Sequence, residues 1–338
     1  QAGKSIDTGG AHSNVLIGYQ AGTGGGAAML SCVAIGDSAM NSTAANAQTG
    51  TIAIGKSALT ALTDGAGNVA VGYLAGAAIN TGDSNIAIGY QAADAMTDAN
   101  NNVAIGHGAL TTMVCGDNNV AIGKSALYSA NEDAYNNNTA VGWETAVNLT
   151  TAVECTAIGS AAMGNGAVTG DSNTALGYKA GYQLAGGSSN TLVGGNAGIA
   201  LTGGAGNTVL GQDAGTATTS VTNTVIIGKS ACQANMTTGA NYTIAIGYAA
   251  QSSLQVGAAN TSVGYASLYT NVDGSYNTAM GYESLFYFEA DTLNHGQNTA
   301  LGYQTGKWVS TGTGNTSVGS YAGHRNTLST NNTAIGHG

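Results

Sequence analysis

Hydrophobic and polar positions recur along this chain with a short and almost fixed period. The phrase Asn-Val-Ala-Ile-Gly at 102–106 returns unchanged at 119–123, and many variants of it follow. We number positions from the glycine of this phrase, the repeat glycine. Of the eighteen spacings between nineteen repeat glycines, twelve are 17 residues. A period of this length over a whole chain predicts a solenoid.

Each position of the repeat has its own chemistry. Position −1 is aliphatic or Met, position −3 is Val, Ile or Thr, and position −2 is mostly Ala. Branched residues favour strands, in which successive side chains point to opposite faces. We therefore predict a short strand before each repeat glycine. We expect positions −3 and −1 to fill the interior, Thr included, and position −2 to point outward.

The rest of the repeat predicts turns and a second short strand. Position +3 is always small and position +7 is often apolar, whereas clusters such as Thr-Gly-Asp-Ser-Asn at 81–85 are typical of turns. Seventeen residues are too few for a strand with a crossover helix. We predict an all-β parallel solenoid of about 19 rungs, a rung being one full turn of the chain.

Asparagine occupies position −4 in fourteen of the nineteen repeats. In a solenoid, equivalent residues of successive rungs stack about 4.8 Å apart. Stacked Asn side chains can form a continuous hydrogen-bonded ladder. We therefore interpret this Asn column as structural, not catalytic.

The Ala column at position −2 bears on self-association. An outward column of small residues suggests that another surface approaches it, most simply a second copy in a symmetric homo-oligomer. The alternative is that both faces of this strand are buried within one coil.

The phrase Asn-(Val/Thr)-Ala-(Ile/Val)-Gly-x-x-Ala, as in residues 68–75, resembles the head repeats of trimeric autotransporter adhesins and related repeats of bacteriophage tail fibres. The resemblance covers essentially the whole chain. It implies a left-handed β-roll in which three chains form one shaft. The period of 17 is longer than that of the adhesin head, which leaves the phage alternative open.

Composition narrows the partners and the compartment. The formal net charge is −10, with 7 Lys and Arg, so we expect no nucleic-acid partner. No apolar run is long enough to span a bilayer, so we expect no membrane insertion. The spacing of the four cysteines along a straight solenoid leaves them too far apart for an intrachain disulfide. Free thiols favour assembly in a reducing cytoplasm, where phage fibres form.

The chain carries no convincing catalytic or metal-binding motif. His107 occupies the variable position +1, which we interpret as a solvent face. Asp83, Asp117 and Asp171 lie in turns without the dense spacing of calcium-binding rolls. The scarce acids Glu144, Glu154, Asp213, Glu283 and Glu289 form no evident pair for glycoside hydrolysis. We therefore predict a protein that is not an enzyme and has no cofactor or metal.

Aromatic residues are the best candidates for surface recognition. Position +1 carries a column of Tyr and Trp, which suit contacts with sugars or proteins, although stacked rings also shield the edges of rungs. A longer rung at 282–301 holds both Phe residues, and an exposed loop there would be a contact site; it could equally pack on a neighbouring chain. The candidates are Tyr73, Tyr90, Trp143, Tyr178, Tyr248, Tyr265, Tyr282, Phe286, Tyr287, Phe288, Tyr303 and Trp308.

These observations predict one repeat domain over residues 1–338 that acts as a structural or adhesive fibre. We expect a phage tail fibre or similar virion appendage that spaces or presents a receptor-binding surface, with a host glycan or protein as partner. The alternatives are a bacterial surface adhesin or extracellular filament and an ice-binding solenoid with a flat Thr array. The expectation that Thr at position −3 points inward disfavours the last.

Overall fold

The computed structural model describes residues 2, 13–24, 29–42, 48–129, 136–290 and 295–338. Contacts divide the chain into two compact units, Gln1–Thr169 and Gly170–Gly338. We call them the N-terminal and C-terminal units. In each, short strands repeat once per rung with almost no helix between them, and a single 3-10 helix, η1 (Thr238–Ala240), lies among the described residues.

Each repeat glycine is preceded by a strand of three residues. In the N-terminal unit these are β1 (Val15–Ile17), β3 (Val33–Ile35), β5 (Ile52–Ile54), β6 (Val69–Val71), β7 (Ile86–Ile88), β8 (Val103–Ile105), β9 (Val120–Ile122), β10 (Thr139–Val141) and β11 (Thr156–Ile158). In the C-terminal unit they are β12 (Thr174–Leu176), β13 (Thr191–Val193), β14 (Thr208–Leu210), β15 (Val225–Ile227), β16 (Ile244–Ile246), β17 (Thr261–Val263), β18 (Thr278–Met280), β19 (Thr299–Leu301), β20 (Thr316–Val318) and β21 (Thr333–Ile335).

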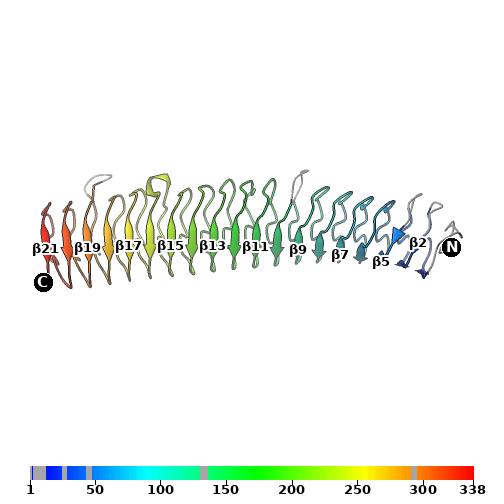
Figure 1. The fold of residues 1–338 in the computed structure, drawn as a ribbon, viewed down its shortest axis with the longest axis horizontal. Coiled ribbons are helices and arrows are strands. Elements are labelled where there is room, and N and C mark those ends of the chain that lie inside the picture. Colours follow the sequence, from blue (N-terminus) through cyan, green and yellow to red (C-terminus); the bar gives the residue numbers. More distant parts are fainter. Residues whose placement is uncertain (1, 3–12, 25–28, 43–47, 130–135, 291–294) are drawn as a thin grey trace. The chain divides into compact units, whose positions relative to one another are not determined.

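Within each unit, successive strands pair in parallel and in register. Val103 lies opposite Val120 and Ala104 opposite Ala121, and the same correspondence continues along the unit. Figure 1 shows the resulting stack of rungs, with one strand in each. The chain is thus an all-β parallel solenoid of about 18–19 turns with a period of about 17 residues, as the sequence predicts.

The expected orientation of the strands is wrong. In β8, Ala104 at position −2 is fully buried, whereas Val103 and Ile105 on either side are partly exposed. Other strands repeat this pattern, including β12, where the Thr at position −3 is also partly exposed. The Ala column therefore lies inside the coil, and positions −3 and −1 form the outer face of the sheet. Thr at position −3 does not point inward.

The interior is too narrow for two bulky layers, which explains the inversion. The small residue at position +3, such as Ala109, and the residue at +4, such as Leu110, are also fully buried. In three of the four rungs with a large aliphatic residue at position −2, namely those of Leu16, Leu192 and Val209, position +4 is Gly, and in the fourth Ile226 is matched by Cys232. A β-carbon added to Gly198 would lie 3.1 Å from the side chain of Leu192, and one added to Gly22 would lie 2.6 Å from Leu16. A larger side chain at position −2 is thus accompanied by a smaller residue at position +4, as close packing of the interior requires.

The predicted second strand at +3 to +7 does not form in the described rungs. Residues at +2 and +4 adopt positive φ, as at Ser125 (56°) and Leu127 (49°), so the backbone there is not extended. Its N–H groups still reach neighbouring rungs: Ser125 N donates to the carbonyl of His107 at 2.9 Å, and Leu127 N to that of Thr145 at 3.0 Å. The residues at +2 and +4 are thus in the left-handed region of φ, and the rungs remain hydrogen-bonded to one another there although no strand forms. A separate two-residue pair, β2 (Met29–Leu30) with β4 (Gln48–Thr49), lies elsewhere in the repeat.

The repeat glycine is required by close approach between rungs. Gly106 has a φ of 137°, and a β-carbon on it would lie 2.5 Å from the carbonyl oxygen of Gly123. Any other residue would clash with the backbone of the next rung and would be strained as well.

The predicted Asn ladder is confirmed. Asn102 is buried, and its Oδ1 accepts hydrogen bonds from the backbone N–H (2.9 Å) and the side-chain amide (3.1 Å) of Asn119. Its own amide donates to the Gly116 carbonyl at 2.8 Å. Asn190 makes equivalent bonds with Asn207 and Gly204 in the C-terminal unit. Each Asn therefore links two rungs and satisfies buried backbone groups.

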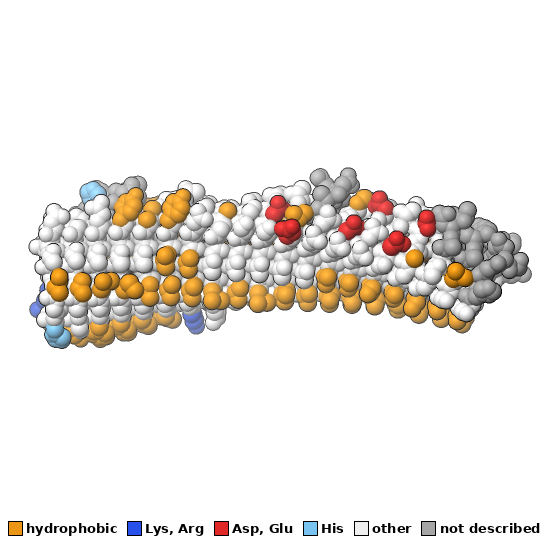
Figure 2. Space-filling view, in the orientation of Figure 1, with side chains coloured by type: hydrophobic (Ala, Val, Ile, Leu, Met, Phe, Trp, Pro, Cys, Tyr) orange, Lys and Arg blue, Asp and Glu red, His pale blue; other side chains and the backbone are white. Residues whose placement is uncertain are grey.

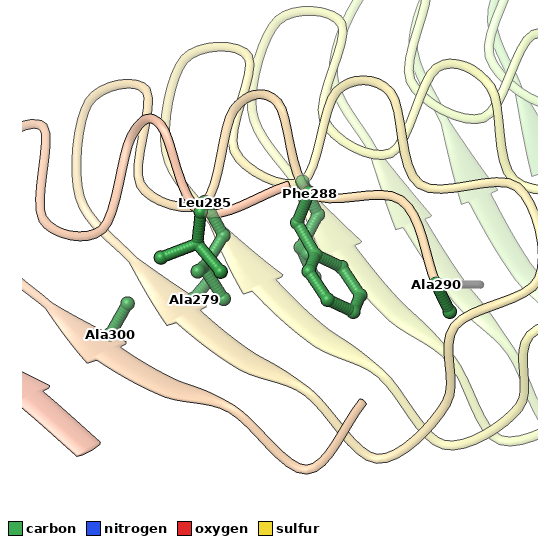
Figure 3. Packing of buried hydrophobic residues seen from close by; sticks show 7 residues of the cluster. Ala279, Leu285, Phe288, Ala290 and Ala300 are labelled. Carbon is green, nitrogen blue, oxygen red and sulfur yellow. The ribbon is translucent and has the colours of Figure 1, made fainter. Parts of the chain in front are cut away.

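Phe288 belongs to the core, which corrects its assignment to a recognition surface. It is fully buried at position +7 and packs in a cluster with Leu268, Leu285 and Val309. Figure 3 shows Phe288 and Leu285 pointing from the turn layer toward Ala279 and Ala300 of the strands. The register therefore places the additional residues of the longer rung after Phe288, and residues 291–294 lie outside the described part.

Candidate functional site

The outer face of the sheet exposes apolar side chains along each unit. Position −1 leaves large aliphatic side chains in solvent, with Ile122 37% and Leu176 45% exposed. Figure 2 shows a row of hydrophobic side chains along the C-terminal ends of the strands of each unit. The described residues at positions −3 and −1 carry no charge. We call this surface the sheet face.

The aromatic candidates at position +1 form stacked ladders, not separate platforms. In the N-terminal unit, Tyr73 stacks on Tyr90 with ring centroids 5.2 Å apart, and Tyr90 stacks on His107 at 5.0 Å. In the C-terminal unit the ladder runs through Tyr248, Tyr265, Tyr282 and Tyr303 at 4.9–5.4 Å. Because each ring covers the face of the next, these ladders present mainly ring edges and hydroxyl groups.

Two further candidates at position +1 differ in their surroundings. Trp143 is 49% exposed, and Tyr178 is exposed beside the Lys179 ammonium, which lies 5.3 Å from its ring centroid. Neither of these two has the stacked neighbours of the ladder tyrosines among the described ring contacts.

A second aromatic cluster lies around the longer rung. Phe286, at position +5, stacks on Tyr269 of the preceding rung at 5.0 Å and contacts Tyr287 edge-on at 4.7 Å. Tyr287 stacks on Trp308 at 4.3 Å. Trp308 therefore covers this rung through Tyr287.

Between the two aromatic columns of the C-terminal unit lies a groove of about 340 Å³. One wall is the edge of the ladder at Tyr248 and Tyr265, and the opposite wall is formed by position +5, including Tyr269. Its floor is position +2, where Ala249 and Ala266 replace the long side chains found in other rungs. The other lining residues are Ser230, Gln233, Ser252, Glu283 and Phe286.

An ion pair closes one end of this groove. The Lys307 ammonium lies 2.6 Å from Glu283 Oε2, which also accepts a hydrogen bond from the Gln304 amide at 2.7 Å, and both charged side chains are less than a fifth exposed. Burial alone would raise the pKa of Glu283, but the hydrogen bonds from Lys307 and Gln304 outweigh it and lower that pKa. The groove therefore ends at a neutralised carboxylate that keeps acceptor capacity.

Glu289 and Asp273 form a carboxyl pair that sequence inspection missed. Glu289 Oε2 accepts a hydrogen bond from the Val272 N–H at 2.8 Å. Burial, together with the adjacent Asp273 carboxyl, raises the pKa of Glu289 to about 7. Asp273 Oδ1 is buried and has no hydrogen-bond partner among the described residues.

The turn acids of the N-terminal unit have structural partners. Asp83 accepts a hydrogen bond from Ala66 N at 2.7 Å, and Asp117 accepts one from Asn100 N at 2.7 Å. Asn100 and Asn136 occupy the same repeat position in the rungs that follow Asp83 and Asp117, so Asp and Asn alternate from rung to rung. The alternation keeps like charges two rungs apart. Within the described residues, no three His, Cys, Asp or Glu side chains converge as a metal site would require.

Two other expectations can be compared with the structure. The four cysteines all lie in the described ranges, and none is in a disulfide. No helix in the described part of the chain is long and apolar enough to cross a membrane.

The sequence alone did not predict the groove, because the groove depends on Ala at position +2 of two adjacent rungs. Only an alignment of the rungs position by position would reveal this.

No protein-family model matches the chain, and a search of curated proteins finds no significant match. The sheet face, the aromatic ladders and the groove are the surfaces from which we infer a function.

Proposed function

We propose that this chain is a non-enzymatic segment of a homo-oligomeric fibre, most simply a trimer of left-handed coils, that presents its aromatic surface to a receptor. A virion tail appendage is the setting that the repeat resemblance favours, and a bacterial surface adhesin or extracellular filament is the alternative. The observation that carries the proposal is the sheet face. It exposes large aliphatic side chains such as Ile88, Ile122 and Leu210 in every few rungs.

A second copy is the occupant that best fits this face. Extended apolar patches on a soluble surface mark interaction sites. The face repeats with the rung spacing and carries no charge, so an identical copy can match it rung for rung in a symmetric arrangement. This replaces the expectation that the Ala column makes the contact, since that column is buried within each coil.

The test is the mass of the purified chain and of two matched variants. Mass photometry is expected to give about three copies of the 33.0 kDa chain. Ile122→Glu places a charge in the face and should release monomers, because burying an unpaired charge costs several kcal/mol. Gln91→Glu, at position +2 where another rung carries Glu144, should leave the assembly intact. A wild-type chain that stays monomeric at micromolar concentration would contradict self-association.

Ice binding is a second candidate because the Thr column lies on the outer face. Eight of the ten described strands in the C-terminal unit begin with Thr, and Thr191 and Thr208 are exposed. The parallel aliphatic column and the rung spacing make a flat, regular array. Thermal hysteresis in solution would support this candidate, and its absence would leave self-association as the use of the face.

A further inference from the structure

We propose that the groove of the C-terminal unit binds a neutral oligosaccharide through the edges of Tyr248, Tyr265 and Tyr269 and the polar groups around them. The inference rests on the presenting role proposed above and names the ligand class for that surface. The groove volume of about 340 Å³ falls within the ~300–1,000 Å³ range of small-ligand sites.

The lining combines the two kinds of contact that a sugar needs. Tyrosine rings offer an apolar edge with a hydroxyl at its tip. Ser230, Gln233 and Ser252 add hydroxyl and amide groups on the adjoining rungs. The methyl groups of Ala249 and Ala266 make a shallow apolar floor between these walls. Hydroxyl-rich ligands with apolar ring faces match this alternation.

Charge selects a neutral ligand. Glu283 is the one charged residue in the groove lining, and its carboxylate is neutralised by Lys307 at 2.6 Å. The carboxylate can accept further hydrogen bonds from sugar hydroxyls, but the groove lining contains no cationic side chain that could pair with a sulfate or carboxylate. The net charge of −10 further opposes anionic glycans.

The groove exists because of a local departure from the repeat. Position +2 holds Gln91 in one rung and Gln304 in another, with φ of 51° and 49°. Ala266 has the same backbone conformation, with φ of 47°. Ala266→Gln is therefore compatible with the fold and would place a long side chain across the floor.

The experiment measures binding of four neutral hexasaccharides, namely maltohexaose, laminarihexaose, mannohexaose and N-acetylchitohexaose, with a heparin hexasaccharide as the anionic probe. Isothermal titration calorimetry and saturation-transfer NMR on the full chain are the readouts. At least one neutral probe is expected to bind with a Kd below about 1 mM. Binding should weaken at least tenfold in Ala266→Gln and in Tyr269→Ser, which copies Ser252 of the preceding rung.

Matched controls lie in the other unit. Ala161→Gln changes the same position +2, and Tyr128→Ser changes the same position +5, so both should leave affinity unchanged. The inference is overturned if no neutral probe binds, if the heparin probe binds more tightly, or if the groove variants bind as the wild type does. Mass photometry without sugar reports self-association separately, so a failure of this inference is distinguishable from a failure of the proposed fibre.

Discussion

The two units share one interior but differ on their surfaces. Ala fills position −2 in most rungs of the N-terminal unit and in half of those of the C-terminal unit, and in both a buried Asn ladder joins the rungs, as at Asn102 and Asn190. On the outside, the strands of the N-terminal unit begin mainly with Val or Ile, whereas most strands of the C-terminal unit begin with Thr. The turns of the N-terminal unit carry Asp, and the C-terminal unit has the longer Tyr ladder and the groove. The comparison indicates that the interior fixes the fold and that the outer columns can vary with function.

The largest effect should come from the core of the longer rung. Phe288→Ala removes a fully buried ring and should lower the free energy of unfolding by about 3–5 kcal/mol. Urea unfolding of the full chain measures this. Tyr287→Ala, one residue away on the exposed side, is the control and should cost far less. Equal losses would mean that Phe288 is not in the core.

Breaking the ladder should affect both units alike. Asn102→Ala and Asn190→Ala each leave buried backbone groups without partners and should each cost about 2–3 kcal/mol. Hydrogen exchange of the neighbouring amides locates the damage within each unit. A large loss in one unit and none in the other would contradict a shared interior.

The volume exchange between positions −2 and +4 can be tested in the N-terminal unit. Ala104→Leu should overpack the coil and cost about 1–3 kcal/mol. Combining it with Leu110→Gly reproduces the Leu192 and Gly198 arrangement of the C-terminal unit. The double variant should be more stable than the sum of the single changes predicts, by about 1 kcal/mol or more. Simple additivity would show that these positions do not face one another.

Glu289 of the C-terminal unit predicts a pH dependence of stability. Because the pKa of Glu289 is raised from 4.5 to about 7 on folding, the folded state holds a proton that the unfolded state releases. Its contribution is full below pH 4.5 and is lost as pH rises to about 7. Glu289→Gln should remove this slope and should be more stable than wild type at pH 8. Thermal melts of the wild type and of Glu289→Gln at pH 5 and pH 8 test this dependence, with Glu144→Gln as the control.

The smallest effect should come from exchanging the outer columns. Val103→Thr and Thr191→Val swap the residue types of the two units at position −3, where Val103 is partly exposed and Thr191 is exposed. Each should change monomer stability by less than about 0.5 kcal/mol. A loss of 2 kcal/mol or more from Val103→Thr would place that side chain inside the coil.

Periodicity was enough to predict the strand, the rung and the Asn ladder, because these depend on residues that recur in register. It was not enough to orient the strand. In most strands, positions −3 and −1 flank a smaller Ala at position −2. Because the flanking residues are mostly larger and more hydrophobic, hydrophobicity alone predicts that they face the interior. The pairing of Leu192 with Gly198 carries the missing signal, since it shows that position −2 shares a confined space with position +4.

The site was less predictable because it depends on exceptions to the repeat. The exposed ladder tyrosines follow from position +1 alone, and Phe288 could have been placed in the core by its position +7. The Glu283–Lys307 pair joins positions +2 and +5 of adjacent rungs, 24 residues apart. The groove needs Ala249 and Ala266 to coincide with aromatic walls, which no single motif encodes.

We propose that each coil buries its Ala column and packs its aliphatic column against another copy. A density map of the purified chain at side-chain resolution would show both contacts. We expect Ala104 inside its own coil and Ile105 packed against the sheet face of a neighbouring copy. A map with Ile105 inside the coil, or with an uncovered sheet face in solvent, would contradict it.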